Sequence, residues 1–272
     1  MSDMIKLPPR TGQIIYGPIH SRRIGVDIGI NLLVQEGKTC NFNCVYCQYG
    51  VTGNPVDYNK GENDWIKPVY VYDAVEKALS TLSRQWYKLD AVTFSGYGEP
   101  TLHPKFTQIV ERVKKIKEKY YPNAKLTLIT NSSTLKYKRI MKIMELFDQI
   151  LAKLDAGTDK TFHLINRPIN KKLKISSIID NLTILSSKVK HLIIQTLLFN
   201  TEDERITPNT SLEEMSAISQ AICKINPKEV QVYTIVRAPA ISSVKPATVS
   251  QLQQLKKYID ERCGSNVNVK IY

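Results

Sequence analysis

Short runs of β-forming residues alternate with longer amphipathic stretches along most of the chain. The first run is GVDIGINLLV at residues 25–34, and the stretches that follow the β-rich runs repeat their apolar residues with the 3.6-residue period of a helix. Five further β-rich runs follow, at residues 89–95, 125–131, 149–155, 191–199 and 229–236. This alternation predicts a parallel sheet with crossover helices, in six strand and helix pairs closed by a last strand at 267–272.

Helices are expected between these strands. On the first, at residues 71–86, one face carries Val75, Ala78, Leu79, Leu82 and Trp86. The others are expected over residues 106–116, then over roughly 135–147, 173–187 and 248–262, with one more that begins at 211. In SLEE at 211–214, Ser211 is expected to cap that helix and Glu214 to reach back as the second half of a capping box.

No linker divides the chain. Residues 1–24 stand outside the repeat as an N-terminal extension, residues 25–240 hold the βα repeat, and residues 241–272 are expected to pack a helix and a strand on the same domain. The longest polar segments, 48–65, 200–210 and 237–247, fall where a strand passes to a helix. In a βα barrel those loops form the C-terminal face, where active sites lie.

Composition indicates a soluble protein of the cytoplasm. Hydrophobic residues make up 42% of the 272 residues and charged residues 23%, and no apolar run is long enough to cross a bilayer. The first residues, MSDMIKLPPRTG, lack the apolar core of a secretion signal. We therefore expect no membrane partner.

The formal charge of +13 favours a partner with phosphates or acidic groups. A simpler explanation is that the lysines form ordinary solvated helix faces, as in residues 111–120 and 135–144. Charge alone therefore leaves binding to RNA or to another acidic macromolecule open.

Three of the five cysteines lie close together in KTCNFNCVYCQYG at 38–50. Cys40, Cys44 and Cys47 have the spacing C-x3-C-x2-C, which lets three thiolates surround one iron-sulfur cluster and leaves one iron without a protein ligand. The other two, Cys223 and Cys263, lie near the ends of expected amphipathic helices and are interpreted as buried, inert thiols. This pattern favours metal chemistry over a disulfide framework.

Two motifs together resemble the radical S-adenosylmethionine (radical SAM) superfamily. Cys40, Cys44 and Cys47, with the aromatic Tyr46 before the last cysteine, match its signature. SGYGEP at 95–100 looks like its glycine-rich GGEP segment with a tyrosine inserted, although alone it would also suit an ordinary strand-to-helix turn. The resemblance implies an α/β fold, a partial (βα)6 TIM-like barrel.

The resemblance also implies two cofactors, a four-iron, four-sulfur (4Fe-4S) cluster and SAM. The three cysteines would hold the cluster, and SAM would bind the open iron. Tyr46 would lie near the adenine, and the turn of Gly96, Tyr97, Gly98 and Glu99 would hold the methionyl group. Reductive cleavage of SAM would then give methionine and a 5′-deoxyadenosyl radical that abstracts hydrogen from a substrate, with electrons from a reductant such as ferredoxin or flavodoxin.

Polar residues at the ends of further expected strands extend this candidate site. These are Thr130, Asn131, Lys153, Asp155 and Gln195. Lys153 and Asp155 lie two apart and so share one face of a strand, and the family places such residues near the carboxylate and ribose of SAM. The alternative is an ion pair at a strand end with no ligand.

GPIHSRRIG at 17–25 and HLINRP at 163–168 resemble one branch of the superfamily that is distantly grouped with the wyosine-forming tRNA enzymes. Arg22, Arg23, Asn166 and Arg167 could form an anion site through charge-assisted hydrogen bonds. They could equally brace loops, and the sequence leaves both readings open.

Three hypotheses remain for the activity. The first is a radical SAM enzyme that acts on a macromolecule such as tRNA, and the second is an activase that installs a radical on a partner enzyme or peptide. The third is a non-catalytic iron-sulfur or zinc protein, and SGYGEP speaks against it because a cluster carrier needs no turn to hold SAM.

Overall fold

All six expected parallel strands are present in one open sheet. The computed structural model describes residues 12–58 and 65–272, so part of the N-terminal extension and part of the loop at 48–65 lie outside the described residues. The parallel strands pair in chain order: β2 (Gly25–Ile30), β5 (Ala91–Phe94), β6 (Lys125–Thr130), β7 (Gln149–Lys153), β8 (Leu192–Thr201) and β9 (Glu229–Thr234).

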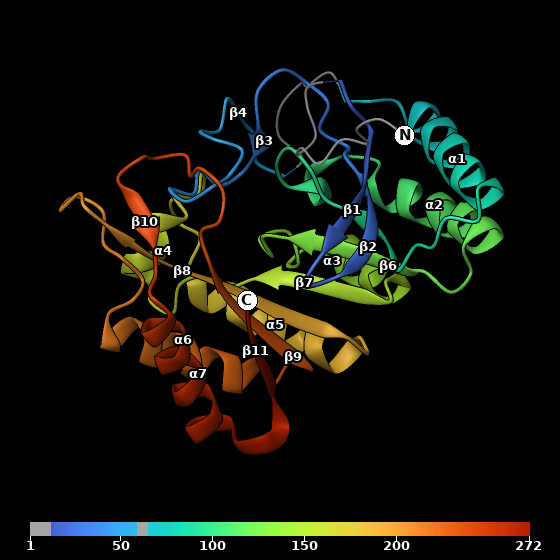
Figure 1. Cartoon of the computed structure of the whole chain (residues 1–272). Helices are drawn as coiled ribbons and strands as arrows, with labels where there is room; N and C mark the ends of the chain where they lie inside the picture. Colours follow the sequence, from blue (N-terminus) through green and yellow to red (C-terminus); the bar gives the residue numbers. More distant parts are fainter. Residues whose placement is uncertain (1–11, 59–64) are drawn as a thin grey trace.

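One further strand lies at each end of this sheet. β1 (Ile15–Ser21) pairs with β2 in the antiparallel direction, and β11 (Asn268–Ile271) pairs with β9 in the parallel direction. β1 and β11 form the two edges of the sheet, and within the described residues they do not pair with each other. The sheet is therefore a partial barrel, open between its edges (Figure 1).

Each crossover contains a helix at the expected place. The helices are α1 (Pro68–Arg84), α2 (Phe106–Tyr120), α3 (Lys138–Ile143), α5 (Ile175–Lys188), α6 (Leu212–Ile225) and α7 (Val249–Cys263). In Figure 1, α1 and α2 lie toward the β2 end of the sheet, and α6 and α7 toward the β9 and β11 end. Their apolar faces are buried, as in α1 through Val71, Val75 and Leu79.

The expected apolar face of α1 is wrong at its end. Trp86 lies beyond the helix, which ends at Arg84, and the Trp86 side chain is 92% exposed. Its backbone has a positive φ of 55°, which no continuing helix allows. The chain turns away before the indole can reach the core.

The capping box expected at α6 is only half present. Ser211 caps the helix by accepting a hydrogen bond from the Glu214 N–H at 3.2 Å. The buried Glu214 carboxylate instead accepts hydrogen bonds from the backbone N–H groups of Gly157 and Thr158, at the start of α4 (Asp159–Ile165), a helix that the periodicity did not predict. A tertiary contact thus replaced the local one.

Cys223 and Cys263 are joined by a disulfide, so the interpretation of both as inert buried thiols is wrong. Cys223 lies in the last turn of α6 and Cys263 is the last residue of α7. Both side chains are only half-buried. They meet because the two helices pack side by side. The Cα atoms of Cys223 and Cys263 are 5.3 Å apart.

Short elements complete the chain. They are β3 (Thr39–Cys40), β4 (Asn54–Pro55), β10 (Val244–Pro246) and three short 3-10 turns at Pro100–Leu102, Met144–Leu146 and Gly264–Asn266. No helix in the described parts of the chain is long and apolar enough to cross a membrane.

Candidate functional site

A cavity of about 490 Å³ lies within the open sheet, and most of the predicted site residues line it. The predicted residues on its walls are Cys40, Cys44, Tyr46, Cys47, Gly96, Gly98, Glu99, Thr130, Asn131, Lys153, Asp155 and Gln195. The exception is Tyr97, which packs its ring edge-on against Tyr49 with 5.5 Å between centroids. Segments far apart in sequence therefore meet at one site.

The cysteine loop is attached directly to the glycine-rich turn. The Thr39 N–H donates to the Tyr97 carbonyl at 3.0 Å, and the Glu99 N–H donates to the Thr39 carbonyl at 3.2 Å. The loop is closed at its other end by Lys38, whose buried ammonium donates to the Gly50 carbonyl at 2.7 Å. These bonds explain why the two motifs form one site.

Gly98 is required by the close approach of these two segments. Its φ is 145°, and a Cβ added there would lie 1.6 Å from the Thr39 carbonyl oxygen. A Cβ on Gly96 would lie 2.3 Å from the Asn31 side-chain oxygen, which accepts the Tyr97 N–H. The two glycines therefore let the turn lie against the start of the cysteine loop.

A side-chain amide lies beside each of two cysteine sulfurs. Asn131 Nδ2 lies 3.7 Å from Cys40 Sγ, and Asn166 Nδ2 lies 3.5 Å from Cys44 Sγ. Burial raises the pKa of the Cys40 thiol and raises that of Cys44 to about 11. Both would thus carry a proton at neutral pH unless a metal displaces it.

The donor set fits an iron-sulfur cluster. All three clustered cysteines are free thiols on one cavity wall, and N–H donors to cluster sulfurs are the contacts that tune such centres. Among the described residues, no three His, Cys, Asp or Glu side chains converge as ligands of a single metal ion. Cys40, Cys44 and Cys47 would hold the cluster, with the Asn131 and Asn166 amides beside it.

Glu99 holds the glycine-rich turn against β6. One carboxylate oxygen accepts hydrogen bonds from the Thr101 N–H and the Thr130 hydroxyl, and the other accepts the Asn131 N–H at 2.6 Å. Burial raises the pKa of Glu99 even though these donors oppose the change. Its contact with a methionyl amino group stays a prediction.

Lys153 and Asp155 face the same way, as their spacing predicts, and form an ion pair at 3.0 Å inside the cavity. The Tyr46 hydroxyl donates to the other Asp155 oxygen at 2.5 Å, and Lys153 donates to the Tyr233 hydroxyl. Burial lowers the pKa of Lys153, but Asp155 and Tyr233 outweigh it and the net shift is upward. The lysine is therefore a fixed cation of the cavity wall.

The four residues considered as one anion site are divided by the structure. Asn166 supports the cysteine loop, because its carbonyl accepts the Asn43 N–H at 3.0 Å and its amide donates to the Tyr46 hydroxyl at 2.7 Å. Arg167 donates to the Leu164 carbonyl and does not line the cavity. Arg22 and Arg23 do line it, from the turn between β1 and β2.

Gln195 lies deep in the same cavity, where its amide donates to Gln231 Oε1 at 2.8 Å. Gln195 and Gln231 face each other on β8 and β9. Polar side chains thus continue below the strand ends into the interior.

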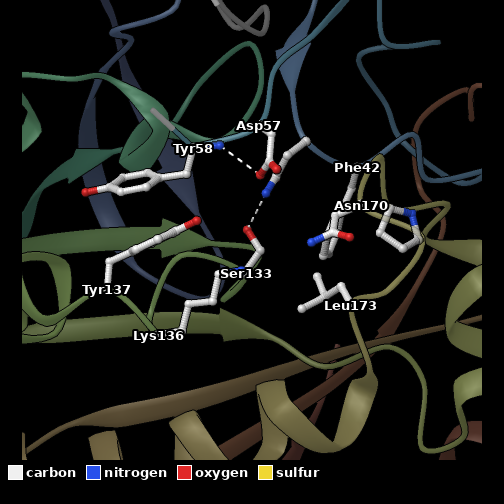
Figure 2. Close-up of a pocket in the computed structure, with 10 residues that line it drawn as sticks. Phe42, Asp57, Tyr58, Ser133, Lys136, Tyr137, Asn170 and Leu173 are labelled. Atoms are coloured by element: carbon white, nitrogen blue, oxygen red, sulfur yellow. Dashed lines mark hydrogen bonds between the residues drawn. The ribbon is translucent and has the colours of Figure 1, made fainter. Parts of the chain in front are cut away.

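A second, much smaller pocket lies behind the cysteine loop (Figure 2). Its volume is about 10 Å³, enough for about one water molecule. The Asn41 amide donates to Ser133 Oγ there at 2.7 Å, and the rings of Tyr58 and Tyr137 stack beside it at 3.8 Å. The Asn41–Ser133 hydrogen bond joins the cysteine loop to the segment that follows β6.

Asp27 is a cavity residue that sequence reasoning missed. Its side chain is 7% exposed, and its only hydrogen bond among the described residues comes from the Thr93 hydroxyl at 2.6 Å. The signal was an acidic residue within the otherwise apolar strand GVDIGI, where a buried carboxylate is costly. The strand face that carries Asp27 points into the cavity, so this residue is a candidate for binding a ligand.

Replacing Asp27 by Asn is expected to stabilise the protein at pH 8 and to change little at pH 4. Burial raises the pKa of Asp27 to about 7 from 3.8, against the opposing effect of the Thr93 hydrogen bond. The folded state thus binds this proton more tightly than the unfolded state does. The Asp27 carboxyl therefore lowers the free energy of unfolding as the pH rises from 3.8 to about 7, and the full loss of stability is present above about pH 7. Each pKa unit corresponds to about 1.4 kcal/mol, so the Tm of D27N at pH 8 should exceed that of the wild type by at least roughly 2–4 °C. An equal or lower Tm at pH 8 would show that the carboxylate is satisfied in the fold.

Comparison with known protein families agrees with the geometry. The model of the radical SAM superfamily matches residues 36–208, a segment that holds the cysteine loop, the glycine-rich turn and the strand ends of the cavity. Over 214 residues the chain is 30% identical to a UPF0026 protein of Synechocystis, which covers 78% of this chain and 74% of that protein. The chain therefore belongs to the radical SAM superfamily of enzymes and to the UPF0026 family.

Two further relatives differ in length from this chain. A UPF0026 protein of Methanocaldococcus jannaschii is 28% identical over 254 residues, 93% of this chain and 73% of that protein. A protein named GTPase Obg from Brachyspira hyodysenteriae is 27% identical over 256 residues, 94% of this chain but 35% of its own length. The chain thus spans about a third of that relative.

Solved structures share the fold. A radical SAM methyltransferase from Sphaerobacter thermophilus superimposes with a TM-score of 0.65 at 14% identity, covering 90% of this chain and 66% of that one. Archaeal TYW1, a wyosine-forming enzyme, gives a TM-score of 0.54 at 14% identity, covering 86% of this chain and 71% of its own. The partial barrel predicted from the motifs is confirmed.

Proposed function

We propose that the protein binds a 4Fe-4S cluster and SAM in the 490 Å³ cavity and cleaves SAM reductively. The observation that carries this proposal is that three free cysteines and the glycine-rich turn, joined by backbone hydrogen bonds, line one cavity. When bound, the cluster would supply the electron that splits SAM into methionine and a 5′-deoxyadenosyl radical, which abstracts hydrogen from the substrate.

The chain's own residues would position SAM and exclude water. Gly96 and Gly98 expose backbone next to the cysteine loop, where the amino acid part of SAM would lie. Lys153 is a buried cation suited to a carboxylate, and Asp155 and Asn131 offer hydrogen bonds at the edge of the same cavity. Tyr46, which is held by Asp155 and Asn166, forms one wall.

The favoured substrate is a macromolecule, such as tRNA. The net charge of +13 supports it, since charge of this sign attracts nucleic acid, and three arginines, Arg22, Arg23 and Arg237, line the cavity. A radical delivered to a partner enzyme or peptide is the alternative. We further propose a reductant such as ferredoxin or flavodoxin, and a cytoplasmic location.

GTP hydrolysis does not extend from the Brachyspira relative to this chain. The sequence of Gly37, Lys38 and Thr39 matches the end of the phosphate-binding loop motif, but Leu32 occupies the position of the first glycine of that motif. Lys38 is 2% exposed, and its ammonium donates to the Gly50 carbonyl, so it closes the cysteine loop in this structure.

Reconstitution without oxygen tests the proposal. Protein loaded with iron and sulfide, then reduced by dithionite, is expected to convert SAM to 5′-deoxyadenosine and methionine in equal amounts, measured by liquid chromatography and mass spectrometry. Absence of 5′-deoxyadenosine from protein that carries four irons, or retention of zinc in place of iron, would refute it. Copurified RNA whose binding weakens steeply with salt would favour the macromolecular substrate.

A further inference from the structure

The cavity contains two polar groups that the cofactor residues do not use. One is the free oxygen of Asp27, on β2, and the other is Nη1 of Arg23, in the turn between β1 and β2. Among the described residues, Nη1 of Arg23 is buried without a hydrogen-bond partner. A buried donor without a partner is costly, and the Asp27 carboxylate lines the cavity beside it, so the two groups together indicate a ligand.

Asp27 faces the cavity from β2, and Gly29 on the same strand has no side chain. Its Oδ1 accepts the Thr93 hydroxyl, and Oδ2 accepts no hydrogen bond from the described residues. Two residues further along β2, Gly29 leaves room for the ring of Tyr16, since a Cβ there would lie 2.0 Å from that ring. The free oxygen and an aromatic ring thus belong to one wall of the cavity.

Arg23 crosses the open side of the barrel. Its guanidinium lies 4.4 Å from the ring centroid of Tyr233 on β9, so the β1–β2 turn touches the opposite end of the sheet. Along β2, Asp27 lies two residues beyond Gly25, which ends the turn, or roughly 7 Å at the rise of a strand. The Arg23 donor therefore lies at the open side of the barrel, and the Asp27 acceptor lies farther inside.

Positive charge predominates at this wall. Arg22 and Arg237 also line the cavity, and in the described ranges no carboxylate lies within ion-pair distance of Arg22, Arg23 or Arg237. Arg237 donates to the Gln48 side chain at 3.0 Å. Three arginines without acidic partners are suited to a phosphate, to which guanidinium groups donate in pairs.

We propose that this wall binds a nucleotide of the substrate, with a base N–H donating to Asp27 and the phosphate bound by Arg23 with Arg22 or Arg237. The proposal deepens the proposed function and rests on it, because it assigns the substrate of the same cavity. The nucleotide could be free or part of an RNA chain, since both offer the same base and phosphate.

A nucleotide fits the wall better than a zwitterionic amino acid does. Of the three carboxylates of the cavity, Asp155 is paired with Lys153 and Glu99 accepts hydrogen bonds from Thr130 and Asn131, which leaves Asp27 beside three arginines. The rings of Tyr16, Tyr49 and Tyr233 line the same space. Bases taken out of an RNA strand are bound by stacking on such rings and on guanidinium planes. A zwitterionic amino acid carries one carboxylate and one ammonium group, so it would leave the excess of cations without an anionic partner.

Binding without turnover tests this assignment. Reconstituted protein with SAM but without reductant is titrated with guanosine 5′-monophosphate by equilibrium dialysis, next to guanosine, inorganic phosphate, glutamate and a short RNA hairpin. The nucleotide should bind more tightly than guanosine, phosphate or glutamate, and R23Q and D27N should each weaken it about tenfold, as expected for a hydrogen bond to a charged group. The RNA binding more tightly than the free nucleotide would identify RNA as the source, and the reverse order would identify a free nucleotide.

A matched control and the separate cleavage assay keep the outcomes distinct. R205Q removes an arginine that is 88% exposed and paired with Asp203, so it should leave nucleotide binding unchanged. D27N is expected to be more stable than the wild type, so its loss of binding cannot come from unfolding. SAM cleavage without binding of the nucleotide or the RNA, or equal affinity in R23Q, D27N and R205Q, would overturn the assignment. Nucleotide binding without SAM cleavage would instead refute the proposed function.

Discussion

Cys44→Ala is expected to abolish SAM cleavage altogether. The replacement removes one of three thiolates on the cavity wall, and Cys223 and Cys263 cannot replace it because they form a disulfide between α6 and α7. Two thiolates do not hold the cluster that would supply the electron. The C44A protein should lose most of its iron after reconstitution and form no detectable 5′-deoxyadenosine. Its fold, measured by circular dichroism, should be retained.

The double variant C223A/C263A is the matched control. It removes two sulfurs from the same chain but none from the cavity, so it should keep its iron and its cleavage activity, and only its stability should fall, by about 2–4 kcal/mol. Retained cleavage in C44A would mean that the cysteine triad is not the cluster site. Lost cleavage in the control would assign a role to the disulfide in the active structure.

The strand pattern of the fold could be predicted because burial on both faces of a parallel strand leaves a plain apolar signal. β5 to β9 all begin within two residues of their expected positions. Two features escaped prediction for opposite reasons. Trp86 lies past the end of its helix because backbone geometry overrides apolar periodicity, and Glu214 leaves its own helix for the N–H groups of Gly157 and Thr158.

The site could be predicted where chemistry is local in sequence. The cysteine triad and SGYGEP each lie within a few residues, so the sequence displays both motifs, and their resemblance to the radical SAM superfamily implies the chemistry. Asp27 and Arg23 gain their significance only from the open side of the barrel, which brings the β1–β2 turn to Tyr233. No local pattern contains that contact, because Arg23 and Tyr233 are brought together only by the curvature of the whole sheet.

Gly98→Ala is expected to reduce SAM cleavage by more than about a hundredfold, because displacement of a binding group by about 1 Å is enough to cost that factor. The new Cβ would lie 1.6 Å from the Thr39 carbonyl oxygen, and the φ of 145° adds strain for any residue with a side chain. The Thr39 carbonyl accepts the Glu99 N–H, and Thr39 precedes Cys40, so the turn and the first cluster ligand must separate together. Both the affinity for SAM, by equilibrium dialysis, and the yield of 5′-deoxyadenosine should therefore fall.

Gly53→Ala separates this effect from a general intolerance of alanine near the loop. Gly53 lies beside the same cysteine loop, yet the nearest atom to a Cβ added there is the Gly37 Cα at 3.4 Å, an ordinary contact. G53A should therefore bind and cleave SAM as the wild type does. If G98A also kept its affinity for SAM, the turn would have room to move, and the close approach of Thr39 to Gly98 would not be what shapes the SAM site. A loss in G98A alone would show that the missing side chain at this one position lets the turn and the cysteine loop form a single site.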